Sequence, residues 1–147
     1  MNRYEGWLKS LNVIYVGDPR APQVGWLSAA GARVIRAERG EEARAATTDD
    51  ASAIEIAVID ADWPGVGWIG LARDLPRSCG LIVISDRSDS DLLEAIAAAR
   101  ADFVSRSATE ADFVFRLKSA TKLAVPSMRR LVPPGIAEMS QYLPLIL

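Results

Sequence analysis

A short apolar run near the middle of the chain ends in a carboxylate and is followed by a turn. Residues 57–59 read Ala-Val-Ile, Asp60 comes next, and Pro64-Gly65 supplies the turn. An apolar run bounded by turn residues is typical of a strand buried on both faces of a parallel sheet. In such sheets, ligands and chemistry lie just beyond the carboxyl ends of the strands. The sequence therefore places Asp60 where an α/β protein carries its functional site.

The overall composition limits the class of protein. At 147 residues, half of them hydrophobic, the chain is long enough for one domain with a substantial core. Its formal net charge of −2 provides no basic surface, so we expect no direct nucleic-acid binding. The single cysteine, Cys79, excludes a disulfide framework and suits the reducing cytoplasm. We expect a cytoplasmic protein without membrane contact, because no stretch approaches the roughly 18 apolar residues of a membrane span.

The chain contains no histidine. Its absence excludes Ser-His-Asp and Cys-His catalytic groups, His-ligated zinc and a phosphohistidine. Chemistry in this chain would have to use carboxylates, hydroxyls, lysine or arginine.

Apolar runs alternate with helical patterns along most of the chain. The runs predict five strands: Asn12–Val16, Arg33–Ala37, Ile54–Asp60, Leu81–Ser85 and Phe103–Ser105. The intervening patterns predict five helices: Pro22–Ala30, Glu41–Thr47, Gly67–Leu75, a helix capped by Ser88–Asp91 that contains Leu92–Ala97, and Thr109–Ala124. This alternation implies an α/β domain, a doubly wound parallel sheet with helices on both faces. Right-handed crossovers favour a flavodoxin-like (βα)5 fold with strand order 2-1-3-4-5.

The predicted domain spans 1–125, and 126–147 read as a proline-containing linker and an apolar C-terminal extension. Pro126 and Pro133-Pro134-Gly135 break the last helix, and apolar residues then recur at helical spacing from Ile136 to Ile146. We expect so apolar a segment to dock on its own domain, to bind a partner chain or to lead into an output domain.

Polar residues stand at the ends of four predicted strands. The first strand ends in Gly17-Asp18, the third in Asp60 and the fourth in Ser85, and Arg106 follows the fifth. These strands are neighbours in the expected topology, so their ends meet on one rim. Carboxylate oxygens suit Mg²⁺, an aspartate can accept a phosphoryl group, and a hydroxyl and a cation can hold its oxygens. The pattern indicates a divalent-metal and phosphoryl site.

In this ordered combination the chain resembles the receiver domain of bacterial response regulators, over about Asn12 to Ala124. The match rests on Asp60 with its downstream Pro-Gly, on Asp18 after the first strand and on Ser85 after the fourth. The resemblance implies that Asp60 accepts the phosphoryl group. It further implies that Asp18, Asp60 and the backbone carbonyl of Asp62 hold Mg²⁺.

Three further roles come from the same resemblance. Ser85 and Arg106 would hold phosphoryl oxygens, and Ser85 and Phe103 would form the switch that reports phosphorylation. The implied partners are a histidine kinase or an output domain.

The chain also departs from the receiver pattern. Gly17 stands where the family has a first metal-binding acid, and Arg106 and Ser107 replace a lysine and a proline. A planar guanidinium is no substitute for a compact ammonium in a tight pocket. Asp86 replaces a small residue and would either repel an incoming phosphoryl group or turn inward to supply the missing carboxylate. We therefore expect Mg²⁺ binding to be weak or absent.

Three hypotheses follow. The first is an atypical receiver, a pseudo-receiver, of a bacterial signalling or transcription-regulating protein; it is no enzyme and acts through protein–protein contact. The second is a working receiver of a two-component phosphorelay, phosphorylated on Asp60 with Mg²⁺. The third is a small-molecule-binding domain. Residues 65–70 match the glycine pattern GxGxxG of nucleotide-binding domains, but the acidic residue expected at the end of a later strand is missing. Apolar residues on more than one face of the last helix, from Phe113 to Leu117, predict a homodimer.

Overall fold

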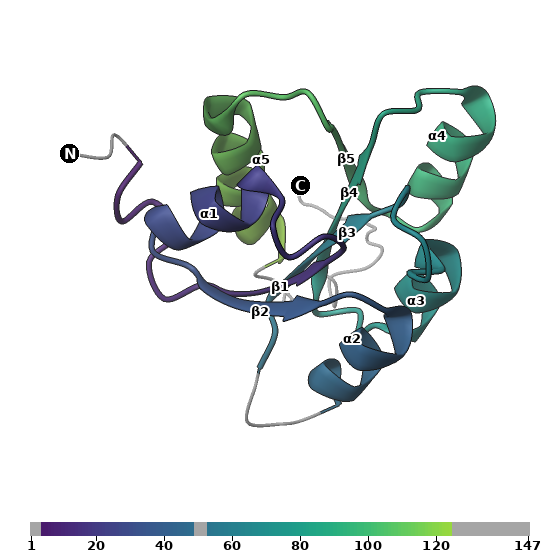
Figure 1. The fold of residues 1–147 in the computed structure, drawn as a ribbon, viewed down its shortest axis with the longest axis horizontal. Coiled ribbons are helices and arrows are strands. Elements are labelled where there is room, and N and C mark those ends of the chain that lie inside the picture. Colours follow the sequence, from purple (N-terminus) through teal and green to yellow (C-terminus); the bar gives the residue numbers. More distant parts are fainter. Residues whose placement is uncertain (1–3, 49–52, 125–147) are drawn as a thin grey trace, which may run out of the picture.

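A single parallel sheet organises the chain in the computed structural model, which describes residues 4–48 and 53–124. Its strand order is β2-β1-β3-β4-β5, so the predicted topology is confirmed. The strands are β1 Asn12–Val16, β2 Arg33–Ala37, β3 Ile56–Asp60, β4 Gly80–Ser85 and β5 Asp102–Ser105. Figure 1 shows β3 at the centre of the sheet, between β1 and β4. The predicted linker and tail, 126–147, lie outside the described residues.

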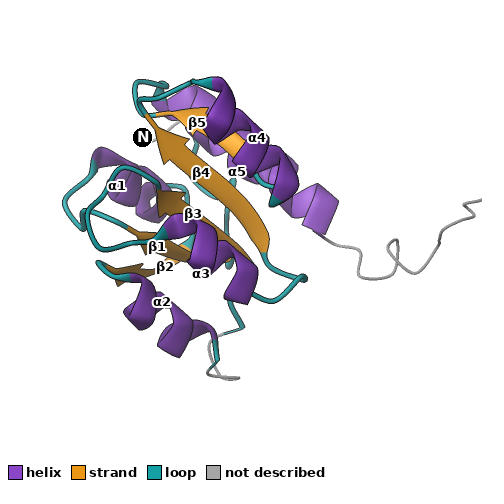
Figure 2. Ribbon diagram, turned by 90° about the vertical axis from the view of Figure 1, so that its right-hand side faces the viewer, coloured by secondary structure: helices purple, strands orange, loops and turns teal. Residues whose placement is uncertain are grey.

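Four helices connect the strands and a fifth follows β5, and together these described helices cover both faces of the sheet (Figure 2). They are α1 Pro22–Ala29, α2 Gly40–Thr47, α3 Trp68–Asp74, α4 Ser90–Ala98 and α5 Glu110–Ala124. Helices α1 and α5 pack on one face, and α2, α3 and α4 pack on the other. None of the described helices is long and apolar enough to cross a membrane.

Side-chain alternation along the central strands divides the core into two layers. Val13 and Tyr15 of β1 face α1 and α5, whereas Ile14 and Val16 face the other three helices. Every residue of β3 is buried, as a central strand covered on both faces requires. The C-terminal end of β3, with Asp60, therefore lies in the middle of the rim formed by the C-terminal ends of the strands.

The observed boundaries differ little from the predicted ones. Strand β3 begins at Ile56 rather than Ile54, and just before it the Glu55 carboxylate accepts the Asn12 N–H (2.8 Å). Helix α4 begins after Asp89, whose carboxylate accepts the Leu92 N–H at 2.9 Å.

Candidate functional site

The ends of β3, β4 and β5 meet on one rim of the sheet. Asp60 closes β3 and is 2% exposed, and Ser85 closes β4 and is 1% exposed. Arg106 directly follows β5, and its backbone N–H donates to the Ser85 carbonyl at 3.1 Å. The structure thus brings together three of the residues that the sequence placed at strand ends.

The Arg106 guanidinium binds three carboxylates. Its Nη1 donates to Asp60 Oδ2 at 2.9 Å, and its Nη2 donates to Asp60 Oδ1 at 2.5 Å. Nη2 also donates to Asp62 Oδ2, and Nε donates to Asp86 Oδ2, both at 3.1 Å. The hydrogen bond to Asp60 is the largest cause that raises the pKa of Arg106, although burial opposes it. This cation neutralises a carboxylate that would otherwise be buried unpaired, at a cost of about 3–5 kcal/mol.

Asp62 joins the loops that follow β3 and β4 through its side chain. Its carboxylate accepts the Ser85 hydroxyl (2.9 Å) and the Asp86 N–H (2.8 Å). Burial raises the pKa of Asp62, but hydrogen bonds from Asp86, Ser85 and Arg106 outweigh it and leave the pKa below its ordinary value. The sequence pattern predicts a role only for the backbone carbonyl of Asp62, whereas its carboxylate is a central hydrogen-bond acceptor of the site.

Asp86 and Ser85 are both engaged within this network. The Asp86 carboxylate is turned onto Arg106, and the Ser85 oxygen, besides donating to Asp62, accepts the Arg87 N–H at 2.9 Å. Asp86 therefore does not take the place of a missing metal ligand in this arrangement. Ser85 has its hydrogen directed at Asp62 rather than into open space.

The end of β1 contributes backbone rather than a carboxylate. Gly17 has φ of 154°, and a Cβ there would lie 2.8 Å from Asp60 Cβ and 3.3 Å from Tyr15 Cε1. An acidic side chain at this position would therefore force its neighbours to move. Asp18 is turned to its own loop, where Oδ1 accepts the Arg20 N–H at 2.9 Å. Asp18 does not join Asp60 in this arrangement.

Two polar residues beneath the rim were not anticipated. The Tyr15 hydroxyl is buried and has no hydrogen-bond partner among the described residues. Burial, and then the negative charge of Asp60, raise the pKa of this phenol. Gln23 of α1 is also buried, and its Nε2 donates to the Arg106 carbonyl at 3.5 Å. The available signal was alternation, because Tyr15 precedes Gly17 by two and so points to the same face.

Phe103 lies on β5 opposite Val83 of β4 and is partly buried. It packs against the core layer beneath α2, α3 and α4. Its predicted role as a moving switch stays a prediction.

Magnesium is the ion that the resemblance implies, and the donor groups do not fit it as they are arranged. In the described part of the chain, no three acidic, cysteine or histidine side chains are placed to hold a metal. The carboxylates of Asp60, Asp62 and Asp86 are all hydrogen-bonded to Arg106, and Asp18 faces Arg20. A divalent cation would have to displace Arg106 to bind Asp60, because Arg106 holds both of its oxygens.

No protein-family model matches the chain, and no curated protein matches it in sequence. Its fold, however, is similar to that of many solved structures. A CheY-like response regulator receiver domain from Methanospirillum hungatei has a TM-score of 0.67 and 17% identity, with 78% of this chain and 97% of that chain covered. The chain has the receiver-domain fold.

Two further solved receiver domains are similar to the chain in fold. The signal receiver domain of an HD domain-containing protein from Pseudomonas fluorescens has a TM-score of 0.71 and 15% identity, covering 83% of this chain and 94% of that one. The receiver domain of the putative response regulator NarL from Mycobacterium tuberculosis has a TM-score of 0.62 and 21% identity, covering 77% and 98%. At such identities the likeness establishes the receiver fold, and the function must be argued from the site.

Proposed function

We propose that this chain is a receiver-type domain of a signalling protein whose phosphoacceptor site is closed by its own Arg106. In this proposal it acts through protein–protein contact and not through phosphoryl transfer. The observation that carries the proposal is the two-pronged hydrogen bonding of Arg106 to both oxygens of Asp60. The receiver fold supports a place in signal transduction, where a kinase or an output domain is the expected kind of partner.

The chemistry of phosphoryl acceptance explains why this contact matters. A carboxylate attacks phosphorus through a free oxygen, and both oxygens of Asp60 are held by Arg106. Asp60 Oδ1 accepts the Asp62 N–H at 2.9 Å as well. When Arg106 leaves, the charges of Asp62 and Asp86 stand beside the reacting oxygen and repel a phosphoryl donor. The missing acid at Gly17 removes a ligand that would counter this repulsion through Mg²⁺.

A titration with Mg²⁺ and beryllofluoride tests the proposal, with acetyl phosphate and intact-mass measurement beside it. Trp63 is a suitable reporter, because it lies three residues after Asp60 and its backbone N–H donates to the Asp60 backbone carbonyl at 3.3 Å. We expect no saturable fluorescence change and no mass gain of a phosphoryl group in the wild type. Arg106→Lys should gain a response, since a single ammonium cannot cover both carboxylate oxygens. A wild-type response lost in Asp60→Asn would overturn the proposal.

Phosphorylation of Asp60 remains the second candidate, and the partial exposure of Arg106 favours it. The Arg106 side chain is 31% exposed, so it has an outward path from the site. In that case Asp60 would become accessible when Arg106 moves away. The third hypothesis, a small-molecule site at the rim, stays a prediction. Gly65 and Gly67 have φ of 86° and 56°, so turn geometry accounts for these two glycines.

We further propose that the domain forms a homodimer through α4, β5 and α5. Both helices contact the edge strand β5. Leu93 of α4 is 43% exposed and Phe115 of α5 is 62% exposed. Large apolar side chains on the two helices that flank an edge strand are suited to cover one another across a two-fold axis.

A further inference from the structure

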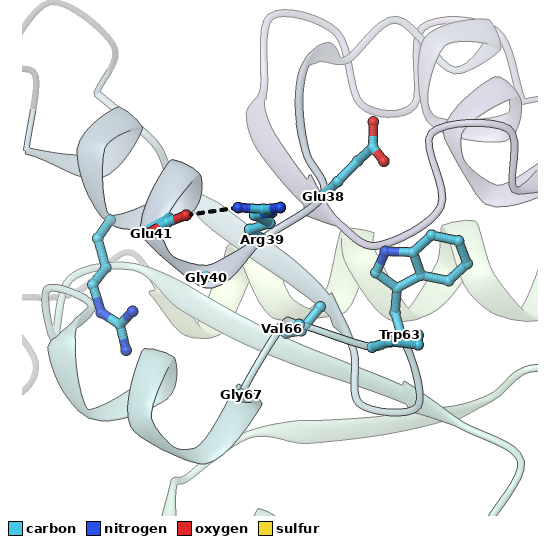
Figure 3. A pocket seen from close by; sticks show the side chains of 10 residues that line it. Glu38, Arg39, Gly40, Glu41, Trp63, Val66 and Gly67 are labelled. Carbon is cyan, nitrogen blue, oxygen red and sulfur yellow. Dashed lines mark hydrogen bonds and ion pairs between the residues drawn. The ribbon is translucent and has the colours of Figure 1, made fainter.

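A cavity of about 770 Å³ opens between the turn that precedes α2 and the loop that joins β3 to α3 (Figure 3). Glu38, Arg39 and Arg44 line it on one side, and Trp63 and Val66 line it on the other. Its volume lies within the range of about 300–1,000 Å³ that is usual for binding pockets. Asp60 is not among its lining residues, so this cavity is separate from the site described above.

The two walls of the cavity are held together by backbone contacts. The Gly40 N–H donates to the Gly65 carbonyl at 3.3 Å. A Cβ on Gly40 would lie 2.5 Å from the Val66 carbonyl oxygen, so the close approach depends on glycine. Trp63 is partly buried against the core layer beneath α3, and its indole borders the cavity. The cavity is therefore formed before any ligand binds, which lowers the entropic cost of binding.

The charged side chains that line the cavity differ in whether they have a partner. Arg39 is paired with Glu41 at 3.2 Å, and Arg44 is paired with Asp74 at 2.6 Å. The Glu38 carboxylate has no hydrogen bond or ion pair with any of the described residues. The cavity thus offers an anion without a partner and an indole, whereas its two cations already have partners. That combination is complementary to a positive charge and not to a negative one.

We propose that this cavity receives a basic side chain of a protein partner, with its guanidinium or ammonium group held between Glu38 and Trp63. The indole attracts a cation through the negative face of its ring, and the carboxylate pairs with it directly. The exposed Pro64 ring provides an apolar surface for the methylene stem of the same side chain. An interaction domain of net charge −2 is suited to a basic partner. The site does not depend on whether Asp60 is phosphorylated.

Nuclear magnetic resonance of the full chain provides the test. The four tryptophan indole N–H resonances are recorded, and Trp63→Phe identifies that of Trp63. N-acetyl-arginine amide is added up to roughly 50 mM, because a single side chain binds weakly. N-acetyl-norleucine amide, of similar stem but without charge, is the matched probe. We expect a saturable shift of the Trp63 resonance with the arginine probe and little shift with the norleucine probe.

Two variants separate direct contact from a general charge effect. Glu38→Gln should weaken the affinity for the arginine probe by roughly twofold to fivefold. Glu94→Gln, on exposed α4, makes the same change in net charge at a remote position and should leave the affinity unchanged. Asp60→Asn should leave it unchanged too, which separates this inference from the proposed function. Equal shifts with both probes, no saturable shift at all, or equal effects of the Glu38 and Glu94 variants would each overturn the proposal.

Discussion

Arg106 places its two terminal guanidinium nitrogens on the two carboxylate oxygens of Asp60, at 2.9 and 2.5 Å. Asp60 is nearly inaccessible, whereas the arginine side chain retains a third of its exposure. A charge buried at the end of the central strand is thus compensated by a residue from the edge of the sheet. The contact makes the stability of the domain and the reactivity of its site depend on the same pair.

Arg106→Ala should destabilise the domain, because it leaves the buried Asp60 carboxylate without its cation. We expect a loss of about 3 kcal/mol in the free energy of unfolding, measured by urea denaturation at neutral pH. Arg87→Ala is the matched control, since its ion pair with Asp89 is exposed and should contribute little. Similar losses in the two variants would contradict the stabilising role of the Arg106 contact.

Asp60→Asn in the Arg106→Ala background should recover part of the lost stability. The second substitution removes the uncompensated charge, so the double variant should be more stable than Arg106→Ala by about 1 kcal/mol or more. Urea denaturation of the wild type and the three variants completes the cycle. Strictly additive losses would show that the two residues do not interact.

Asp62 should give the domain a pH-dependent stability on the acid side. Its pKa in the folded state lies below the ordinary value of 3.8. Its contribution is therefore fully present above that value and is lost as the pH falls through the lower pKa of the folded state. Urea midpoints measured from pH 6 to about pH 3 should fall less steeply for Asp62→Asn than for the wild type. Parallel curves would count against the proposed hydrogen bonding of this carboxylate.

Gly17→Ala should destabilise the domain, because the new methyl group would lie 2.8 Å from Asp60 Cβ. We expect a loss of about 1–3 kcal/mol by urea denaturation. Gly25→Ala is the control: it lies in α1, its Cβ would meet nothing within 4 Å, and it should stabilise by about 0.5–1 kcal/mol. An unchanged Gly17→Ala variant would show that β1 can withdraw from Asp60 at little cost.

Phe115→Glu should abolish self-association. We expect the wild type to sediment as a dimer at roughly 50 μM, as a modest apolar interface allows. Ile69→Glu is the control, since Ile69 is similarly exposed but lies on α3. A monomeric wild type at that concentration would refute the proposed homodimer.

The buried strands could be predicted from the sequence because each is short and apolar and is followed by turn residues. The run that ends in Asp60 is the clearest case, and its position at the centre of the sheet follows from its burial on both faces. The orientation of the Arg106 side chain, in contrast, could not be predicted from the sequence. The sequence places it after β5, but its reach to Asp60 depends on the path of the following loop and on three carboxylates around it.

Two other features of the site depended on side-chain direction in the same way. The sequence is compatible with two roles for Asp86, repelling a phosphoryl group or binding a metal, whereas in the structure its carboxylate binds Arg106. The sequence pattern predicts a role for the Asp62 backbone, whereas the Asp62 side chain accepts hydrogen bonds from the Ser85 hydroxyl and the Asp86 N–H. Loop carboxylates adopt whichever direction the nearby donors allow, and those donors come from segments distant in sequence. Composition and periodicity carry no information about that choice.

The cation at the rim is part of the polypeptide, and this has a consequence for regulation under the proposed function. A diffusing ion or a transferred phosphoryl group can be supplied and withdrawn, so it can carry information about time. Arg106, in contrast, is present from the synthesis of the chain until its degradation. A domain closed in this way has one resting shape throughout its lifetime. The number of copies present, and not their chemical state, then sets how many partners are engaged.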